Sequence, residues 1–160
     1  MRVGLAPAGF VPGPALLQLL REAFASMDGR IDPPSSLARM GLDELRAKAE
    51  VETLILATEG PALLGCVFAD LRKDVVYVGK LAVAEPARGR GIARALLAEA
   101  EALARRHGRP FLELQTRIEL VENHITFAAL GFETVAHTAH PGYDRPTSLT
   151  LRRPVPAEAG

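Results

Sequence analysis

A strand–helix–strand pattern in residues 75–116 constrains the fold of this chain most strongly. The apolar run "DVVYVGKLAVAE" predicts a strand, "GIARALLAEAEALARRHG" predicts an amphipathic helix, and "PFLELQT" predicts a second strand. Gly108 marks the end of that helix. Two strands that a helix connects in this way run parallel in one sheet, because only antiparallel neighbours can be joined by a tight turn.

The rest of the chain follows a different pattern. The runs "ETLILATEG" and "PALLGCVFADL" meet at a Gly-Pro pair, so they predict an antiparallel pair of strands. The other expected elements are a strand at 1–6, helices at 14–27, at about 36–50 and at 119–131, and strands at 132–140 and 146–154. This order predicts an α+β fold: a mixed, mostly antiparallel sheet flanked by helices, with one central β-α-β crossover. A doubly wound sheet would alternate strand and helix throughout.

Periodicity also predicts which side chains share a face. Strict alternation along the strand at 74–85 places Tyr77, Gly79 and Leu81 on one side of the sheet. The inward-facing residues expected in the long helix are Ile92, Leu96, Ala100, Leu103 and Ala104.

Length and composition fit one domain. The chain has 160 residues, of which 48% are hydrophobic, and we expect a folded domain over 1–153 with a loose tail at 154–160. Basic and acidic residues number 19 each, so bulk charge favours neither nucleic acid nor a membrane surface as a partner. Prolines interrupt the apolar N-terminal run, so we expect neither a targeting segment nor a membrane span.

The one cysteine, Cys66, lies in an apolar run and cannot form an internal disulfide. This favours a cytoplasmic location and a buried structural role rather than a nucleophile. No Cys/His pair has the spacing of metal ligands, so no metal site is expected.

The loop "RGRGIA", residues 88–93, precedes the long helix. Free backbone N–H groups at a helix N-terminus, glycines that allow close approach and two arginines together favour an anion such as phosphate. A tight turn with two solvated arginines is the alternative interpretation. Ile92-Ala93 replaces the Lys-Ser/Thr of a P-loop, and Arg94 replaces the third glycine of the dinucleotide fingerprint.

The segment "LAVAEPARGRGIARALLAEAEALARRHG" resembles the acyl-CoA-binding segment of the GCN5-related N-acetyltransferase (GNAT) superfamily. The family pattern Arg/Gln-x-x-Gly-x-Gly/Ala is met by Arg88, Gly91 and Ala93. "LGF" at 130–132 is similar to the end of the family's last helix, and the strand order also matches. The resemblance covers roughly residues 1–153 and implies a GNAT-like fold with acetyl-CoA as co-substrate.

The resemblance also implies how the cofactor is held. The pyrophosphate would bind backbone N–H groups in the loop residues Arg88, Gly89, Arg90, Gly91, Ile92 and Ala93. The strand residues Leu81, Ala82 and Val83 would pair with the pantetheine amides, with the thioester carbonyl near the Val83 N–H. Asn123 would lie near the cofactor on the helix face it shares with Phe127; an exposed helix asparagine is the alternative.

One position departs from the family pattern. In many members a tyrosine four residues before the glycine of the terminal "GF" protonates the departing thiolate, and Phe127 stands there in this chain. Transfer is not excluded, because CoA thiolate is already a fair leaving group and water can supply the proton.

Other residues are therefore candidates for proton transfer. Tyr77 precedes the "LAV" strand segment at a position where several relatives carry a general base, or it is a core or rim tyrosine. Tyr143, in the loop "HPGYDRP", either reaches the active site or closes that loop. Glu113 could accept an amine proton through water, or belong to a solvated strand face. His137 and His140 are expected at the surface.

The acceptor site would be formed by the first two helices and the loop "GRIDPPSS". Asp32 could attract an amine there, and Ser35 or Ser36 could bind it, although Ser36 is preferred as a helix N-cap.

Three hypotheses of function follow. The first is an acyl-CoA-dependent N-acetyltransferase that acts by direct attack of a small-molecule or protein amine on the thioester. The second is a non-catalytic acyl-CoA-binding or sensing domain, and the third is a protein-interaction domain whose loop is only structural. The resemblance makes a homodimer possible.

Overall fold

The computed structural model of the chain describes residues 1–157 and contains the predicted crossover. Strand β4 (Val75–Val83) runs parallel to β5 (Phe111–Arg117), and helix α3 (Ile92–Arg106) joins them. The five residues predicted to face inward from α3 are all buried. The helix stops at Gly108, whose φ of 68° is a conformation that glycine adopts without strain.

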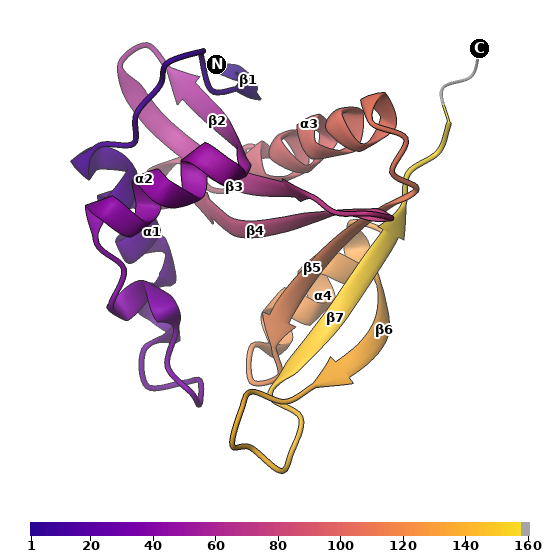
Figure 1. The fold of residues 1–160 in the computed structure, drawn as a ribbon. Coiled ribbons are helices and arrows are strands. Elements are labelled where there is room, and N and C mark those ends of the chain that lie inside the picture. Colours follow the sequence, from indigo (N-terminus) through magenta and orange to yellow (C-terminus); the bar gives the residue numbers. More distant parts are fainter. Residues whose placement is uncertain (158–160) are drawn as a thin grey trace.

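Seven strands of the described chain form one sheet in the order β1-β2-β3-β4-β5-β7-β6 (Figure 1). Every neighbouring pair except β4–β5 is antiparallel. The structure thus confirms the predicted single-domain α+β fold with a mostly antiparallel sheet. The other elements are β1 (Arg2–Leu5), α1 (Pro14–Phe24), α2 (Leu42–Val51), β2 (Thr53–Glu59), β3 (Ala62–Leu71), α4 (Val121–Ala129), β6 (Glu133–Thr138), β7 (Ser148–Pro154) and 3₁₀ turns at Ala25–Met27, Ser36–Ala38 and Glu85–Ala87.

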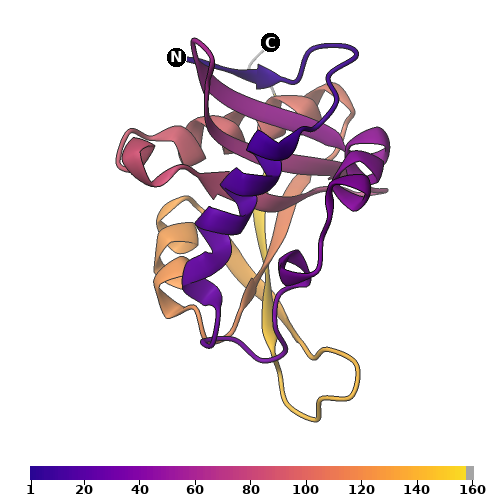
Figure 2. The ribbon, with the colours of Figure 1, turned by 90° about the vertical axis from the view of Figure 1, so that its left-hand side faces the viewer.

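Helices cover both faces of the sheet. One core packs α3 and the end of α4 against apolar side chains of the central strands, including Ile55, Val67 and Leu112. A second core packs α1 and α2 against the opposite face, around Leu54 and Phe68. Figure 2 shows α1 crossing in front of this second face. The sheet therefore separates two helical layers, and a gap between its strands connects the α3–α4 side with the α1–α2 side.

A β-bulge in β4 changes the predicted faces of that strand. Phe68 on β3 is opposite Gly79, but Cys66 is opposite Ala82, so two residues of β4 are opposite one of β3. Lys80, in the bulge, has a φ of 54°. An extra residue reverses the alternation, so Leu81 packs in the α3-side core while Ala82 packs in the α1-side core. The prediction that Leu81 shares a face with Tyr77 was wrong, since simple alternation cannot reveal a bulge.

The helix predicted at about 36–50 is also interrupted. A 3₁₀ turn covers Ser36–Ala38, and α2 starts only at Leu42 because Gly41, its N-cap, is extended. The capping hydroxyl belongs to Ser35, which accepts a hydrogen bond from the Leu37 N–H at 3.2 Å. The preference for Ser36 as the cap was therefore wrong by one residue.

Contacts between the C-terminal segment and the rest of the domain continue beyond residue 153. Pro154 is the last residue of β7, and the Val155 N–H donates to the Pro110 carbonyl at 2.8 Å. Arg105 donates to the carbonyl of Pro156 at 3.0 Å. Residues 158–160 of the predicted tail lie outside the described residues, and the boundary at 153 stays a prediction. Within residues 1–157 no helix has the length and apolar character needed to span a membrane.

Candidate functional site

The parallel strands β4 and β5 pair over only three residues and then diverge (Figure 1). Residues 75–77 of β4 pair with 111–113 of β5, and the rest of β4 has no partner on that side. The Ala84 N–H donates to Leu64 on the β3 side at 2.8 Å. Because N–H groups alternate between the two edges of a strand, the Val83 N–H faces the gap. This length of β4 is an unpaired edge onto which an extended ligand can add.

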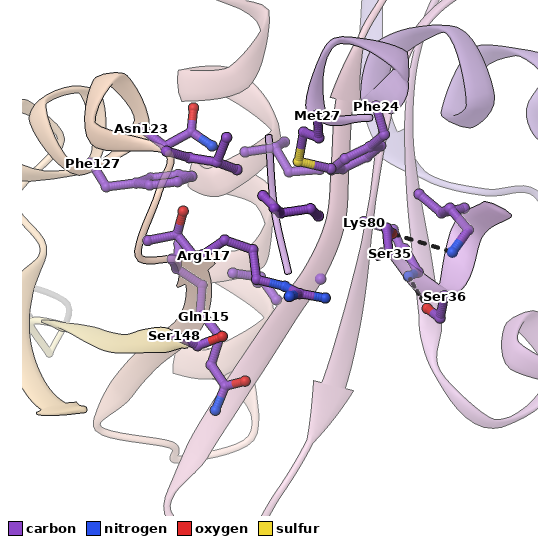
Figure 3. A pocket seen from close by; sticks show the side chains of 18 of the residues that line it. Phe24, Met27, Ser35, Ser36, Lys80, Gln115, Arg117, Asn123, Phe127 and Ser148 are labelled. Carbon is purple, nitrogen blue, oxygen red and sulfur yellow. Dashed lines mark hydrogen bonds between the residues drawn. The ribbon is translucent and has the colours of Figure 1, made fainter. Parts of the chain in front are cut away.

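A cavity of about 530 Å³ fills this gap and passes through the sheet. On the α4 side it is bordered by Asn123 and Phe127, and on the α1–α2 side by Ser35, Ser36 and Lys80, as Figure 3 shows. Residues 77–81 of β4 and 114–117 of β5 line its middle. A ligand entering from one helical layer can therefore meet another ligand entering from the opposite layer.

The loop before α3 offers free backbone donors. Gly89 and Gly91 have φ values of 82° and 76°, and a Cβ built at either position would meet no atom within 4 Å. The first bond back into the helix runs from the Ala95 N–H to the Gly91 carbonyl at 3.0 Å. The N–H groups of residues 92–94 thus remain free, as at any helix start, and no side chain caps them. The loop is exposed and fits an anionic group.

The two arginines of this loop differ. Arg90 donates to Glu59 at 2.8 Å, and this contact lowers the pKa of the Glu59 carboxyl. Arg88 is exposed and forms no ion pair within the described part of the chain. Arg88 is therefore the freer of the two positive charges beside the α3 N-terminus.

The predicted cofactor residues form one continuous path. Ala93 borders the cavity directly, together with Leu81, Asn123 and Phe127. Ala82 and Val83 continue β4 from the cavity towards the loop, although their side chains do not line it. The path joins the free edge of β4 to the free N-terminus of α3.

Phe127 contributes an apolar ring to this path. Its ring meets that of Phe132 edge-on, with 5.9 Å between the centroids. It brings no acidic proton into the cavity, as the sequence indicated. Asn123, one turn earlier on α4, presents its amide to the same side of the cavity (Figure 3).

The three residues predicted for proton transfer are not brought together. Tyr77 lines the cavity, and burial raises its pKa although the Arg72 guanidinium, 4.1 Å from the ring centre, opposes that shift. Glu113 does not reach the cavity, because it accepts from Arg152 at 2.8 Å. Tyr143 also lies outside the lining, where its hydroxyl donates to Asp32.

Asp32 belongs to a polar network outside the residues that line the cavity. The Arg145 guanidinium pairs with the Asp32 carboxylate at 3.2 Å, and the Asp32 backbone N–H donates to the Glu119 carboxylate at 3.0 Å. Asp32 does not line the cavity, so the attraction of an amine by Asp32 stays a prediction. Ser35 and Ser36, also predicted for the acceptor site, do line the cavity.

The cationic residues that line the cavity, Lys80, Arg117 and Lys48, were missed from the sequence. The Lys80 ammonium donates to the Ser36 hydroxyl at 3.2 Å, and burial, followed by the charge of Lys48, lowers its pKa. Arg117 extends from β5 and donates to the carbonyls of Pro33 and Pro34 at 2.6 and 3.3 Å. A lysine inside the apolar run "VVYVGKLAV" was a detectable signal. Nothing local marked Arg117.

His140 was also missed as a cavity residue. It was expected at the surface, but it is half-buried and lines the cavity, whereas His137 is exposed. Its Nδ1 contacts the Thr147 hydroxyl, which fixes the ring. Burial, followed by the charge of Arg117, lowers the pKa of His140, so that the imidazole is neutral near pH 7.

Cys66 is fully buried, and burial raises the pKa of its thiol to about 12. It therefore has the structural character that the sequence predicted. Among the described residues no group of three or more His, Cys, Asp or Glu side chains is placed to hold a metal ion.

The family assignment rests on the sequence, since the sequence model described as "Acetyltransferase (GNAT) family" matches residues 14–132. The chain therefore belongs to the GNAT acetyltransferase family. No curated protein matches it significantly.

Solved structures share the fold. The ribosomal-protein-S18-alanine N-acetyltransferase of Escherichia coli is 16% identical with a TM-score of 0.71, over 99% of this chain and 96% of that one. A Bacillus subtilis acetyltransferase in complex with CoA is 19% identical with a TM-score of 0.68, over 96% and 97%. A GNAT-family acetyltransferase of Elizabethkingia anophelis with acetyl-CoA bound is 18% identical with a TM-score of 0.66, also over 96% and 97%.

Proposed function

We propose that this protein transfers an acetyl group from acetyl-CoA to the amine of a small molecule or a protein, by direct attack of the amine on the thioester. The observation that carries this proposal is the unpaired edge of β4, which connects a cavity through the sheet with the free N-terminus of α3. The family assignment and the CoA-bound relatives support the choice of co-substrate.

Acetyl-CoA binding is assigned mainly to backbone groups. The pantetheine amides add to the edge of β4 at Leu81, Ala82 and Val83 as an extra strand. The pyrophosphate binds the N–H groups of residues 88–93, with Arg88 adding positive charge. The Val83 N–H is the proposed donor to the oxyanion that forms at the thioester carbonyl.

The reaction needs a neutral amine and a proton for the leaving group. The amine nitrogen attacks the carbonyl carbon, the carbon–sulfur bond breaks, and the thiolate takes a proton. We assign the removal of the amine proton to His140, whose neutral imidazole lines the cavity. We assign delivery of a proton to Tyr77, which its raised pKa keeps protonated at neutral pH. Tyr143 is then given no direct role in proton transfer, because its hydroxyl is bonded to Asp32 outside the cavity lining.

A second candidate is a protein that binds acyl-CoA without transferring the acyl group. Phe127, an apolar residue where many relatives place the acid, favours this candidate. The two functions share the cofactor path and differ only in turnover. A cytoplasmic location and a homodimer stay predictions from the sequence and the family resemblance.

Calorimetry and a thiol-release assay test both candidates. We expect acetyl-CoA to bind with heat release and to raise the melting temperature. Thiol release should then occur with part of a panel of amines. Binding without release from any amine would favour the binding protein, and absence of binding at millimolar acetyl-CoA would remove both candidates.

A further inference from the structure

Two cations approach the same cavity from the two strands that form the gap. Lys80 extends from the bulge of β4 and Arg117 from the end of β5, and both are half-buried (Figure 3). A third cation, Lys48 of α2, also lines the cavity. The lining contains no aspartate or glutamate. Within the described chain, the cavity is therefore positively charged.

Lys80 and Arg117 have no carboxylate partner among residues 1–157. Lys48, by contrast, pairs with Glu52 at 2.6 Å. Arg117 donates only to two backbone carbonyls, and Lys80 only to the hydroxyl of Ser36.

The nearby carboxylates make their short contacts with other groups, although Glu119 and Asp32 act on Arg117, and Glu52 acts on Lys80, at longer range. Asp32 pairs with Arg145, and one oxygen of Glu119 accepts from the Asp32 N–H, while the other Glu119 oxygen is buried without a hydrogen-bond partner. The protein thus holds two like charges in a partly buried space with no carboxylate of the described residues in direct contact with either. Such an arrangement is unfavourable until an anion enters, because burial removes water and each charge opposes the other.

The two cations lie on the side of the cavity assigned to the acceptor. Lys80 contacts Ser36, and Arg117 contacts Pro33 and Pro34, all in the segment between α1 and α2. The cofactor path runs instead along α4 and to the N-terminus of α3. The charge is therefore placed to recognise the acceptor rather than the phosphates of CoA.

We propose that the acceptor is an amine that carries a carboxylate, such as a free amino acid, and that Lys80 and Arg117 bind this carboxylate. A carboxylate accepts hydrogen bonds from an ammonium and from the remaining N–H groups of a guanidinium at the same time. The proposal deepens the proposed acetyltransferase function and rests on it. The same two charges repel polycationic acceptors, which disfavours polyamines and basic peptides as substrates.

The first test compares amino acids with their amides on the wild-type protein. Each pair differs in the carboxylate, and kcat/KM is calculated for the neutral amine to remove the difference in amine pKa. We expect the amino acid to be preferred by about tenfold to a hundredfold, the range of a charge-assisted hydrogen bond. Equal or better use of the amides would overturn the proposal.

The second test uses Lys80→Gln and Arg117→Gln, with Lys73→Gln and Arg106→Gln as exposed controls outside the cavity. Each cavity variant should raise KM for the amino acid by about tenfold or more while KM for the amide changes little. The affinity for acetyl-CoA should stay the same. Lys80 makes one contact with a hydroxyl, so Lys80→Gln decides the question if Arg117→Gln does not fold.

The two levels of the proposal fail in different ways. Acetylation of amides or peptides with no preference for carboxylates would overturn this inference and leave the acetyltransferase in place. A preference for succinyl-CoA over acetyl-CoA that Lys80→Gln abolishes would assign the cations to the acyl group and also overturn it. Calorimetric binding of the amino acid, lost in Lys80→Gln, would support the carboxylate site even if no acetyl transfer occurred.

Discussion

The proposed cofactor end and the proposed acceptor end of this cavity are built in different ways. At the cofactor end the free groups belong to the backbone: the edge of β4 and the first N–H groups of α3. At the acceptor end the groups are side chains from distant segments, namely Lys80, Arg117 and His140. Backbone binding depends on local geometry, and glycines in a short motif record that geometry. Side-chain binding depends on the fold that brings the segments together.

This contrast predicts that single substitutions separate the two ends. Changes at the cofactor end should alter the affinity for acetyl-CoA or the stability of its scaffold. Changes at the acceptor end should alter turnover or acceptor affinity with acetyl-CoA binding intact.

Tyr77→Phe should have the largest effect. It removes the only phenol that lines the cavity within the described residues, and we expect kcat to fall by about a hundredfold, the lower limit of general acid catalysis. The affinity for acetyl-CoA should not change. Tyr143→Phe is the matched control, because that hydroxyl lies at the rim on Asp32. Comparable losses in both variants would show that the two tyrosines were assigned wrongly.

His140→Gln should lower kcat/KM by about tenfold to a hundredfold at pH 7. A base must be neutral, so the wild-type rate per neutral amine should fall as the pH drops through the pKa of His140, which lies below its ordinary value. The variant should lack this acidic limb. His137→Gln, on the exposed side of β6, should keep the wild-type profile. A limb that persists in His140→Gln would assign the base to another group.

Gly65→Ala should destabilise the scaffold of the cofactor end. A Cβ at Gly65 would lie 2.9 Å from the Ala82 carbonyl and 3.1 Å from the Ile92 side chain, where β3, β4 and α3 meet. We expect a loss of about 1–3 kcal/mol in the free energy of unfolding, measured by urea denaturation. Gly4→Ala on β1, where a Cβ meets nothing within 4 Å, should cost less. Equal losses would mean that this close approach is relaxed in solution.

Gly91→Ala should weaken acetyl-CoA binding by about tenfold. The left-handed conformation costs an L-residue about 1–2 kcal/mol, so the substituted loop relaxes away from it in the free protein and acetyl-CoA binding must restore it. Gly108→Ala imposes similar strain at the other end of α3 and serves as the control. Calorimetry should find weakened binding in Gly91→Ala only. Equal weakening in both variants would indicate loss of the helix rather than loss of a phosphate site.

The sequence predicted the fold better than it predicted the site. Apolar runs and their periodicity identified the strands and the crossover, because most of these elements have enough residues to show a period. The bulge in β4 was invisible, since two residues opposite one leave no mark in a single strand. The helix predicted as continuous is also interrupted, because the backbone of Gly41 is extended just before the first residue of α2.

At the site, local sequence patterns revealed the proposed cofactor end but not the proposed acceptor end. The loop "RGRGIA" was readable because its function would lie in consecutive residues. Arg117 and His140 enter the cavity only through the packing of β5 and of the β6–β7 connection against the segment after α1. Glu113 illustrates the opposite error. The sequence suggested it for the site, but in the fold it is held by Arg152, which lies 39 residues away along the chain. No spacing rule could have shown that pairing.

A crystal structure of the protein with CoA and an amino acid acceptor tests the central claim most directly. We expect the pantetheine arm along the free edge of β4, the pyrophosphate over residues 88–93, and the acceptor carboxylate between Lys80 and Arg117. CoA bound outside the gap between β4 and β5, or an acceptor carboxylate that contacts neither cation, would contradict the account.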